Sequence, residues 1–364
     1  MKQKYYSLSK IDKKNAHSSV IFGERSNGKT YAVLQKMIEN WFRNNKQSAL
    51  VRRWQDDFKS KRGATMFAAL DEVIKKESGG AYDHVDYYGG RFYMAAWIIE
   101  DSGARKSVRD DNPFCYGFAL SAMEHDKSTS YPNITILCFD EFITRDSYLN
   151  DEFILFMNVV STIVRQRKDV KIYMLGNTVN KFCPYFAEMG LSHVKDMEPG
   201  QIDVYNYGES DLIVAVERTG TSQTNKKESD VYFAFNNPKL KMITHGSWEI
   251  DIYPHLKRHY RSGDVVFNYF IIWEDEILQA DIVIDELSFY TYIHRKTTEL
   301  KDPDSDIVYQ IESDQRHNYY KNLKRPVDRL SQKITNHFKS HKIFYQDNEV
   351  GEIVRNYLQW CDKN

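Results

Sequence analysis

Near the start of the chain, one octapeptide combines glycines, a lysine and a hydroxyl side chain at the GxxxxGK[ST] spacing of a phosphate-binding loop. Its residues are Gly23, Glu24, Arg25, Ser26, Asn27, Gly28, Lys29 and Thr30. Glycines let the backbone curl until its N–H groups point at phosphate oxygens, and Lys29 can reach the β- and γ-phosphates. Thr30 supplies a hydroxyl ligand for Mg²⁺. A surface turn could carry the same glycines, but the apolar strand before the loop and the amphipathic helix after it favour nucleotide binding.

An acidic pair follows the apolar run at residues 134–139. Asp140 and Glu141 come directly after this run, which is the Walker B pattern of a strand that ends opposite the phosphate loop. Asp140 can hold Mg²⁺ there, and Glu141 can polarise the attacking water. The sequence contains no NKxD motif for recognising guanine. We therefore predict an ATPase, with ATP and Mg²⁺ as its cofactors.

Four polar side chains elsewhere are weaker candidates. Asn177 follows a predicted strand and would act as a γ-phosphate sensor, although an Asn can also cap a turn there. Arg165 closes a predicted helix, where the helix dipole favours a cation; the alternative is an arginine finger that reaches a neighbouring subunit's γ-phosphate. Arg53, at a strand end, and Lys127, on a polar loop, could bind nucleotide or a neighbouring subunit, or could be solvated.

The first half of the chain alternates strands with amphipathic helices, the pattern of a parallel α/β sheet. We expect strands at 19–22, 49–51, 134–139 and 170–175, helices at 30–42, 66–74 and 152–164, and a hairpin at 85–94. The end of the strand at 170–175 would place Asn177 near the phosphate loop.

The sequence changes in character after about residue 200. A polar stretch at 219–230 indicates a flexible loop, and strands are expected at 265–272 and 277–284, followed by a turn-rich break at 302–306. Residues 316–342 have a helical and basic pattern, with eight Lys and Arg residues against Asp328 alone, a net charge of +7. Carboxylates in this half are scattered, so we expect no nuclease site. The expected domains are residues 1–200, a linker or lid at 201–247, and residues 248–364.

Composition excludes several classes of protein. The 364 residues carry 50 Lys and Arg against 51 Asp and Glu, a formal charge of −1, which argues against a protein that coats nucleic acid by bulk charge. The 41% share of hydrophobic residues allows packed cores and argues against disorder. No stretch approaches the ~18 apolar residues of a membrane helix, and we expect neither a signal peptide nor membrane contact. Four scattered cysteines suit a reducing compartment.

Together these motifs resemble those of the DNA-encapsidation ATPases of small podophages (Picovirinae type), packaging motors that work with a structural RNA. The resemblance covers about residues 5–190 in order and spacing. Its carriers are GERSNGKT, VRR at 51–53, Lys127 with Tyr131-Pro132-Asn133, ILCFDEFI at 136–143, VRQR at 164–167, GNT at 176–178 and CPYF at 183–186. Beyond residue 200 the resemblance rests on length and strand pattern.

This resemblance implies an α/β P-loop fold of the additional-strand catalytic-glutamate (ASCE) type in residues 1–200. It implies a smaller α+β domain in 248–364, similar to a vestigial ribonuclease-H-like fold that lacks catalytic acids. Asp140 falls on the metal-binding position, Glu141 on the catalytic position and Arg165 on that of a trans-acting finger, with Arg167 in reserve. Lys127 falls on a position implicated in action between subunits.

The same resemblance implies what the chain assembles with. A homopentameric ring would translocate double-stranded DNA at the portal vertex of a procapsid, driven by ATP hydrolysis and in contact with the portal protein and a packaging RNA. The basic tail would contact DNA, RNA or portal. The protein would occupy the host cytoplasm, attach to the procapsid transiently and be absent from the mature virion.

Two other functions fit parts of the pattern. A different ring-forming P-loop translocase or helicase would share the fold, and a helicase would separate the strands of forked DNA. A nucleic-acid-binding scaffold with a structural phosphate loop would not depend on Glu141. The complete set of Lys29, Asp140 and Glu141 argues against the scaffold.

Overall fold

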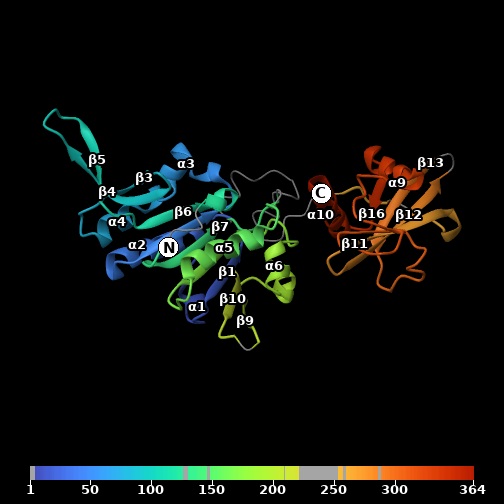
Figure 1. The fold of residues 1–364 in the computed structure, drawn as a ribbon, viewed down its shortest axis with the longest axis horizontal. Coiled ribbons are helices and arrows are strands. Elements are labelled where there is room, and N and C mark those ends of the chain that lie inside the picture. Colours follow the sequence, from blue (N-terminus) through green and yellow to red (C-terminus); the bar gives the residue numbers. More distant parts are fainter. Residues whose placement is uncertain are drawn as a thin grey trace. The chain divides into compact units, whose positions relative to one another are not determined.

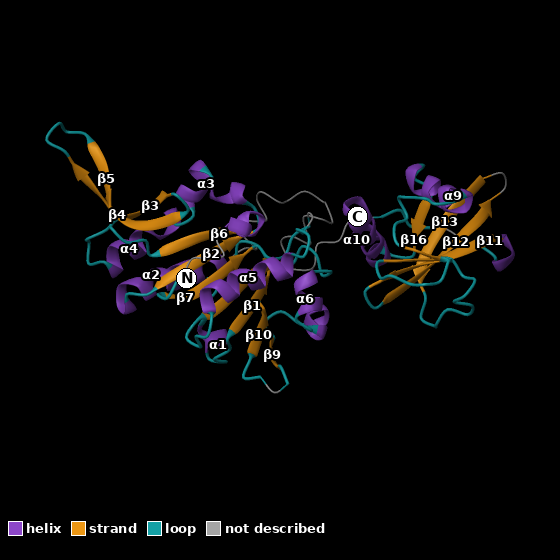
Figure 2. Cartoon of the chain, in the orientation of Figure 1, coloured by secondary structure: helices purple, strands orange, loops and turns teal. Residues whose placement is uncertain are grey.

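The computed structural model describes residues 5–125, 130–145, 148–208, 210–220, 253–256, 260–285 and 288–364. The chain divides into two compact units, Met1–Glu249 and Ile250–Asn364. Each unit is built around its own β-sheet, and the chain passes from blue to yellow in the first and from orange to red in the second (Figure 1). Helices flank the strands in both units (Figure 2).

The first unit contains a ten-stranded sheet of order β3-β4-β6-β2-β7-β8-β1-β10-β9, in which β5 also pairs with β4. Its strands are β1 (Ser18–Gly23), β2 (Gln47–Arg52), β3 (His84–Tyr88), β4 (Arg91–Ile99), β5 (Arg105–Arg109), β6 (Cys115–Ala119), β7 (Ile134–Asp140), β8 (Lys171–Asn177), β9 (Ile202–Asn206) and β10 (Ile213–Arg218). The strands from β6 to β10 in this order pair in parallel. The strands expected at 19–22, 49–51, 134–139 and 170–175 are confirmed as β1, β2, β7 and β8.

Strand β8 lies between β1, which leads into the phosphate loop, and β7, which ends in the Walker B carboxylates. An extra strand between these two is what distinguishes the additional-strand P-loop fold, and the expected fold class is confirmed. The register aligns Gly23 with Asn177 and Asp140 with Leu175, so the ends of the three strands meet along one edge.

Helices cover both faces of this sheet. They are α1 (Ser9–Asp12), α2 (Lys29–Asn44), α3 (Ser60–Thr65), α4 (Asp71–Glu77), α5 (Glu152–Val164) and α6 (Pro184–Glu188), with short 3-10 turns at Gln55–Phe58, Ala68–Leu70, Leu120–His125 and Ser192–Asp196. On α2, Val33 and Ile38 pack into one apolar cluster, whereas Phe156 of α5 belongs to another. The neighbouring residues Leu137 and Cys138 of β7 belong to different clusters, so the clusters lie on opposite faces of the sheet.

Two elements of the first unit differ from expectation. The helix expected at 66–74 is instead a 3-10 turn followed by α4, which begins at Asp71. Acidic side chains at 71 and 72 favour a helix start at that point, because they face the positive end of the helix dipole. The linker expected from 201 starts later, because β9 and β10 extend the sheet to Arg218, with β10 parallel to β1. From residue 221 the expected polar loop lies outside the described residues.

The hairpin expected at 85–94 is confirmed as β3 and β4. Gly89 and Gly90 form its turn with φ values of 57° and 77°, and positive φ at both turn residues matches the right-handed twist of the flanking strands. Strand β4 then continues beyond β3 and pairs with β5, so that an arm projects from the sheet (Figure 1).

The second unit contains a six-stranded sheet of order β15-β14-β11-β12-β13-β16. Its strands are β11 (Val265–Trp273), β12 (Glu276–Asp285), β13 (Ser288–Arg295), β14 (Val308–Gln310), β15 (Tyr319–Tyr320) and β16 (Ile343–Tyr345), and its helices are α9 (Arg329–Lys339) and α10 (Asn348–Lys363). Counted from β11, the six strands follow the order 6-3-2-1-4-5. The first five, with an antiparallel second strand, keep the 3-2-1-4-5 order expected of a ribonuclease-H-like sheet, and β16 adds a sixth strand parallel to β13. The tail expected to be helical from residue 316 alternates strands with helices. Within the described residues, no helix is long and apolar enough to cross a membrane.

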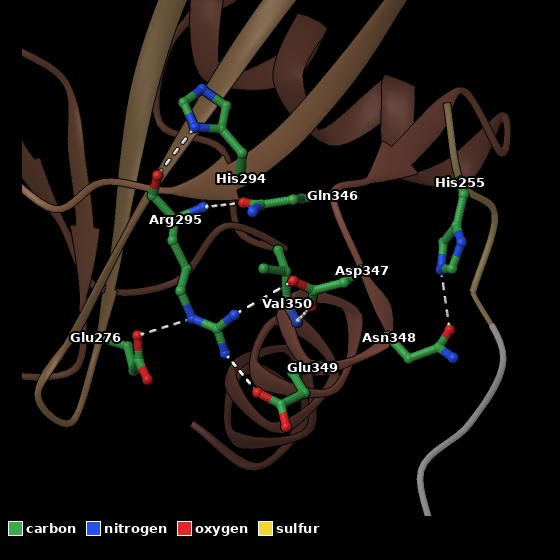
Figure 3. A network of polar contacts seen from close by, with 9 residues as sticks. All are labelled: His255, Glu276, His294, Arg295, Gln346, Asp347, Asn348, Glu349 and Val350. Carbon is green, nitrogen blue, oxygen red and sulfur yellow. Dashed lines mark hydrogen bonds and ion pairs between the residues drawn. The ribbon is translucent and has the colours of Figure 1, made fainter. Parts of the chain in front are cut away.

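Arg295, at the end of β13, ties α10 to this sheet (Figure 3). Its guanidinium forms ion pairs with Glu276 at 3.4 Å, Asp347 at 3.3 Å and Glu349 at 2.8 Å. Asp347 also caps α10, because its carboxylate accepts a hydrogen bond from the N–H of Val350 at 2.8 Å. One arginine therefore links the β12–β13 hairpin to the start of the last helix.

Candidate active site

The phosphate loop between β1 and α2 is fixed by contacts with two other segments. The amide of Asn27 donates to Thr219 Oγ1 at 2.7 Å, and its carbonyl oxygen accepts from the N–H of Tyr6 at 3.0 Å. Gly28 has a φ of 93°, a conformation that favours glycine. A Cβ atom on Gly23 would lie 2.1 Å from Thr219 Oγ1, so no side chain fits there. Glycine is therefore required at position 28 by the backbone conformation and at position 23 by the close approach of Thr219.

Lys29 is buried in the centre of this loop. Its Nζ donates to the carbonyl oxygen of Glu24 at 2.6 Å and to Oδ1 of both Asn27 and Asn177 at 3.3 Å. Burial lowers the pKa of Lys29 to about 8, and the Asp140 and Glu24 carboxylates oppose this shift. The ammonium therefore remains charged at neutral pH. Together with the first N–H groups of α2, it can hold an anionic phosphate.

Thr30 and Asp140 meet across the edge of the sheet. Thr30 Oγ1 donates to Asp140 Oδ1 at 3.0 Å. Burial raises the pKa of the Asp140 carboxyl, whereas the Arg52 guanidinium lowers it. A hydroxyl and a carboxylate suit Mg²⁺, which takes few protein ligands and keeps several waters. No group of three or more His, Cys, Asp or Glu side chains that could hold a metal ion occurs in the described part of the chain.

Glu141 is held beside this pair by Arg52, the last residue of β2. Arg52 donates from Nη1 to Glu141 Oε2 at 2.7 Å and from Nη2 to Asp140 Oδ2 at 2.8 Å. Burial lowers the pKa of Arg52, but these two carboxylates outweigh it and the net shift is upward. Glu141 has a φ of 63°, and such strained backbone is concentrated at functional sites. Its side chain is 63% exposed.

Arg53 contacts the Walker B turn, because its Nη1 donates to the main-chain carbonyl oxygen of Glu141 at 3.2 Å, and a contact with nucleotide stays a prediction. Its guanidinium is buried and binds both carboxylate oxygens of Glu152, at 2.7 and 2.9 Å, and the carbonyl oxygen of Phe142 at 2.8 Å. It also lies 5.0 Å from the ring centroid of Tyr148. Arg53 therefore anchors the start of α5 to the end of β7, while its neighbour Arg52 faces the Walker B carboxylates.

Asn177, at the end of β8, lies beside the phosphate loop as expected from its position in the sequence. Its Oδ1 accepts from Lys29 Nζ at 3.3 Å, and its backbone pairs with Gly23. Its use as a γ-phosphate sensor stays a prediction. Among the remaining loop residues, Glu24 is buried, whereas Arg25 and Ser26 are exposed.

Arg165 and Arg167 follow α5 but have different surroundings. Arg167 donates to the carbonyl oxygens of Ile134 at 2.7 Å and of Pro132 and Ile163 at 2.8 Å, so its guanidinium holds the start of β7. Arg165 is exposed and has a φ of 50° at the end of α5. Of the two candidates for a finger, Arg165 is therefore the better placed to leave its own subunit. Lys127 lies outside the described residues.

The family model for the podovirus DNA encapsidation protein (Gp16) matches residues 1–358. The chain is also similar to the DNA packaging proteins of Bacillus phages PZA and phi29. Each is 25% identical over 198 residues, or 52% of this chain and 51% of the relative. These matches thus span about half the length of the curated relatives. In structure, the chain is similar to one in the bacteriophage Phi-29 viral genome packaging motor assembly, with a TM-score of 0.56 and 18% identity over 99% of this chain and 98% of that chain. This likeness supports the fold of both units.

Proposed function

The chain belongs to the podovirus DNA encapsidation protein (Gp16) family, and on that premise we propose that it is an ATP-driven motor that translocates double-stranded DNA into a procapsid. The meeting of Lys29, Thr30, Asp140 and Glu141 at one edge of the sheet carries the proposal. Separate strands bring together a phosphate-binding lysine, a metal-binding pair and an exposed acid. Hydrolysis of a nucleoside triphosphate needs these groups.

In this proposal, residues 23–30 bind the phosphates of ATP, and Lys29 compensates their charge. Thr30 and Asp140 hold Mg²⁺, whose charge would stabilise the phosphate oxygens when it is bound. Glu141 orients the attacking water and accepts its proton. Asn177 lies where it would respond to the γ-phosphate, because it contacts Lys29.

The contact with Arg52 implies that Glu141 has a resting position and a working one. Arg52 occupies Oε2 of Glu141 at 2.7 Å, and the same guanidinium holds Asp140. The contact engages Oε2 and fixes the orientation of the carboxylate, so a rotation of Glu141 toward a bound nucleotide would break it. We infer that Arg52 keeps Glu141 in place until nucleotide and metal compete for the Asp140 carboxylate.

Arg165 supports a ring rather than a monomer as the active form. Arg165 follows α5 at the end of the sheet where β7 begins, because the nearby Arg167 contacts Ile134, the first residue of β7. The phosphate loop lies at the opposite end of the strands. The 13 residues of α5 span about 20 Å, so Arg165 is too distant to serve its own nucleotide. We propose that it acts on a neighbouring subunit in a homopentameric ring, as the family resemblance implies, with Lys127 contributing between subunits.

The proposed partners are duplex DNA, the portal protein and a packaging RNA. A motor should hold DNA by its phosphates, since it must be indifferent to sequence. We propose residues 1–200 together with β10 as the ATPase part and 248–364 as a nuclease-inactive part that binds nucleic acid or portal. Exposed cations such as Arg325 and Arg329 in the second unit support this assignment. The protein would act in the host cytoplasm, on the procapsid portal vertex, and be absent from mature virions.

The decisive experiment is protection of DNA from nuclease in a packaging reaction. Wild-type protein with procapsids and ATP, with and without packaging RNA, should protect duplex DNA. Glu141→Gln should give no protection, and Glu188→Gln, which removes an exposed acid at the end of α6, serves as the matched control. Equal protection by Glu141→Gln would favour the scaffold, and strand separation of forked DNA would favour a helicase.

A further inference from the structure

A cavity of about 440 Å³ lies within the second unit, remote in sequence from the residues of the nucleotide site. Its lining comes from residues 253–254, the segment before α9, the end of α9, β16 and α10. Most of this lining is apolar and includes Pro254, Leu323, Phe338, Ile343 and Leu358. The volume falls in the range of cavities that accept ligands, and such cavities are mainly apolar with a few placed polar groups.

Among the described residues that line this cavity, the charged side chains are Lys324 and Lys339, and His341 also lines it. Lys324 is paired with Asp362 at 2.6 Å. Lys339 and His341 form no ion pair with any described residue, and Lys342 is a further exposed cation next to them. The cavity therefore offers an apolar interior with uncompensated positive charge at its rim.

We propose that this cavity docks a peptide segment of a partner protein in which an apolar side chain is flanked by acidic residues. The apolar side chain would leave water against Leu323, Ile343 and Leu358, which is the main driving force of such contacts. The flanking carboxylates would meet Lys339 at the end of α9 and Lys342 after it, whereas Lys324 is already paired with Asp362. A fatty acid carries one carboxylate and would satisfy only one of these positions, and duplex DNA offers no apolar group that enters a cavity.

This proposal concerns the second unit alone and does not depend on ATP hydrolysis. A fluorescein-labelled dodecapeptide with a central Leu-Phe pair between runs of Glu is the probe. Full-length protein should raise its fluorescence anisotropy. Replacing Leu-Phe by Ala-Ala, or the Glu runs by Lys, should weaken binding by about tenfold or more, and added salt should weaken it further.

Three variants of the protein test whether the peptide binds in this cavity. Leu358→Trp should fill the cavity and reduce binding by about tenfold. Lys339→Gln removes a cation of the rim and should also weaken binding. Lys333→Gln is the matched control, because Lys333 is exposed on the same helix but does not line the cavity, and it should leave binding unchanged. Thermal unfolding and ATPase rate check that each variant is folded.

The proposal is overturned if no acidic peptide binds at concentrations up to about 1 mM. It is also overturned if Lys339→Gln and Lys333→Gln behave alike, or if a folded Leu358→Trp protein binds the peptide as wild type does. Displacement of the peptide by duplex DNA or oleate, at concentrations below those of the peptide, would assign the cavity to nucleic acid or lipid instead. If Leu358→Trp does not fold, the comparison of Lys339→Gln with Lys333→Gln and the comparison of the peptides still test the proposal.

Discussion

Replacing Arg52 by Gln tests whether this arginine keeps the metal-binding carboxylate ionised. The contact between Arg52 and Asp140 measures 2.8 Å, and the Asp140 side chain is 5% exposed, so solvent cannot take over the role of the guanidinium. Burial raises the pKa of Asp140 and Arg52 opposes that shift. An arginine next to an Asp lowers the pKa of that Asp by about 1–3 units. We therefore expect Asp140 in Arg52→Gln to titrate at higher pH than in the wild type.

The assay is the pH dependence of steady-state phosphate release from ATP. Only the ionised carboxylate binds metal, so the acidic limb of the rate profile should move to higher pH in Arg52→Gln. Arg52→Lys keeps a cation and should shift the limb less. Arg43→Gln is the control, because Arg43 is exposed on α2 and its ion pairs are with Glu39 and Glu77, neither of which belongs to the nucleotide site, and it should leave the profile in place.

An unshifted acidic limb in folded Arg52→Gln would refute this reasoning. Folding is checked by thermal unfolding, where loss of a hydrogen bond to a buried charge should cost about 1.5–3 kcal/mol. In a unit of this size that lowers the Tm by roughly 3–10 °C. The pair with exposed Glu141 adds little to this figure, because solvent screens it.

Four other changes test the site and the second unit. Glu141→Gln should still bind ATP but release phosphate at least about 100-fold more slowly in a steady-state assay. Arg165→Ala should be inactive alone, and subunits of it mixed with Glu141→Gln should recover part of the ATPase rate. Arg53→Ala leaves the buried Glu152 carboxylate unpaired and should lower the free energy of unfolding in urea by about 3–5 kcal/mol. The hydrogen bond to Asp281 raises the pKa of His294 above 6.5 despite burial, so His294 stabilises fully below that pH and less as pH rises through the raised value. The urea midpoints of wild type and His294→Gln should therefore converge from pH 6 to pH 8.

Each of these outcomes has a contrary result. Undiminished phosphate release by Glu141→Gln would remove it from catalysis, and the lack of recovery in assembled mixtures would count against a finger acting between subunits. For Arg53, Arg43→Ala is the control with an exposed side chain, and equal losses in the two variants would mean that the buried ion pair contributes nothing special. A constant gap between the urea midpoints of wild type and His294→Gln across this pH range would show that the imidazolium is not what stabilises the unit.

The phosphate loop and the two acids could be located from the sequence because their patterns are local. A strand, a glycine-rich loop and a helix follow one another within residues 18–44, and the Walker B acids directly follow a buried strand. Hydrophobic periodicity likewise predicts α5 at its observed bounds, because its buried residues recur at helical spacing.

The choice between Arg52 and Arg53 could not be made in this way. Successive side chains on a strand point to opposite faces, and which of the two meets the Walker B acids depends on pairing with β7, 88 residues later. Arg53 contacts Glu152 across a similar gap in sequence. The start of the linker was predicted too early for a related reason, since β10 joins the sheet by pairing with β1 from the far end of the unit.

Strand β8 runs from the segment after Arg165 to the phosphate loop. In the proposed ring, Arg165 would face the next subunit, whereas the loop would bind the subunit's own nucleotide. The last residue of the strand, Asn177, contacts Lys29 in the phosphate loop, and its first residue follows the turn that carries Arg165. Seven residues in extended form span about 23 Å, and hydrogen bonds to β1 and β7 on both sides keep such a strand stiff along its axis. The two ends cannot shift independently. In the proposed ring, a change at one subunit's nucleotide would therefore have a short mechanical route to the surface that faces the next subunit.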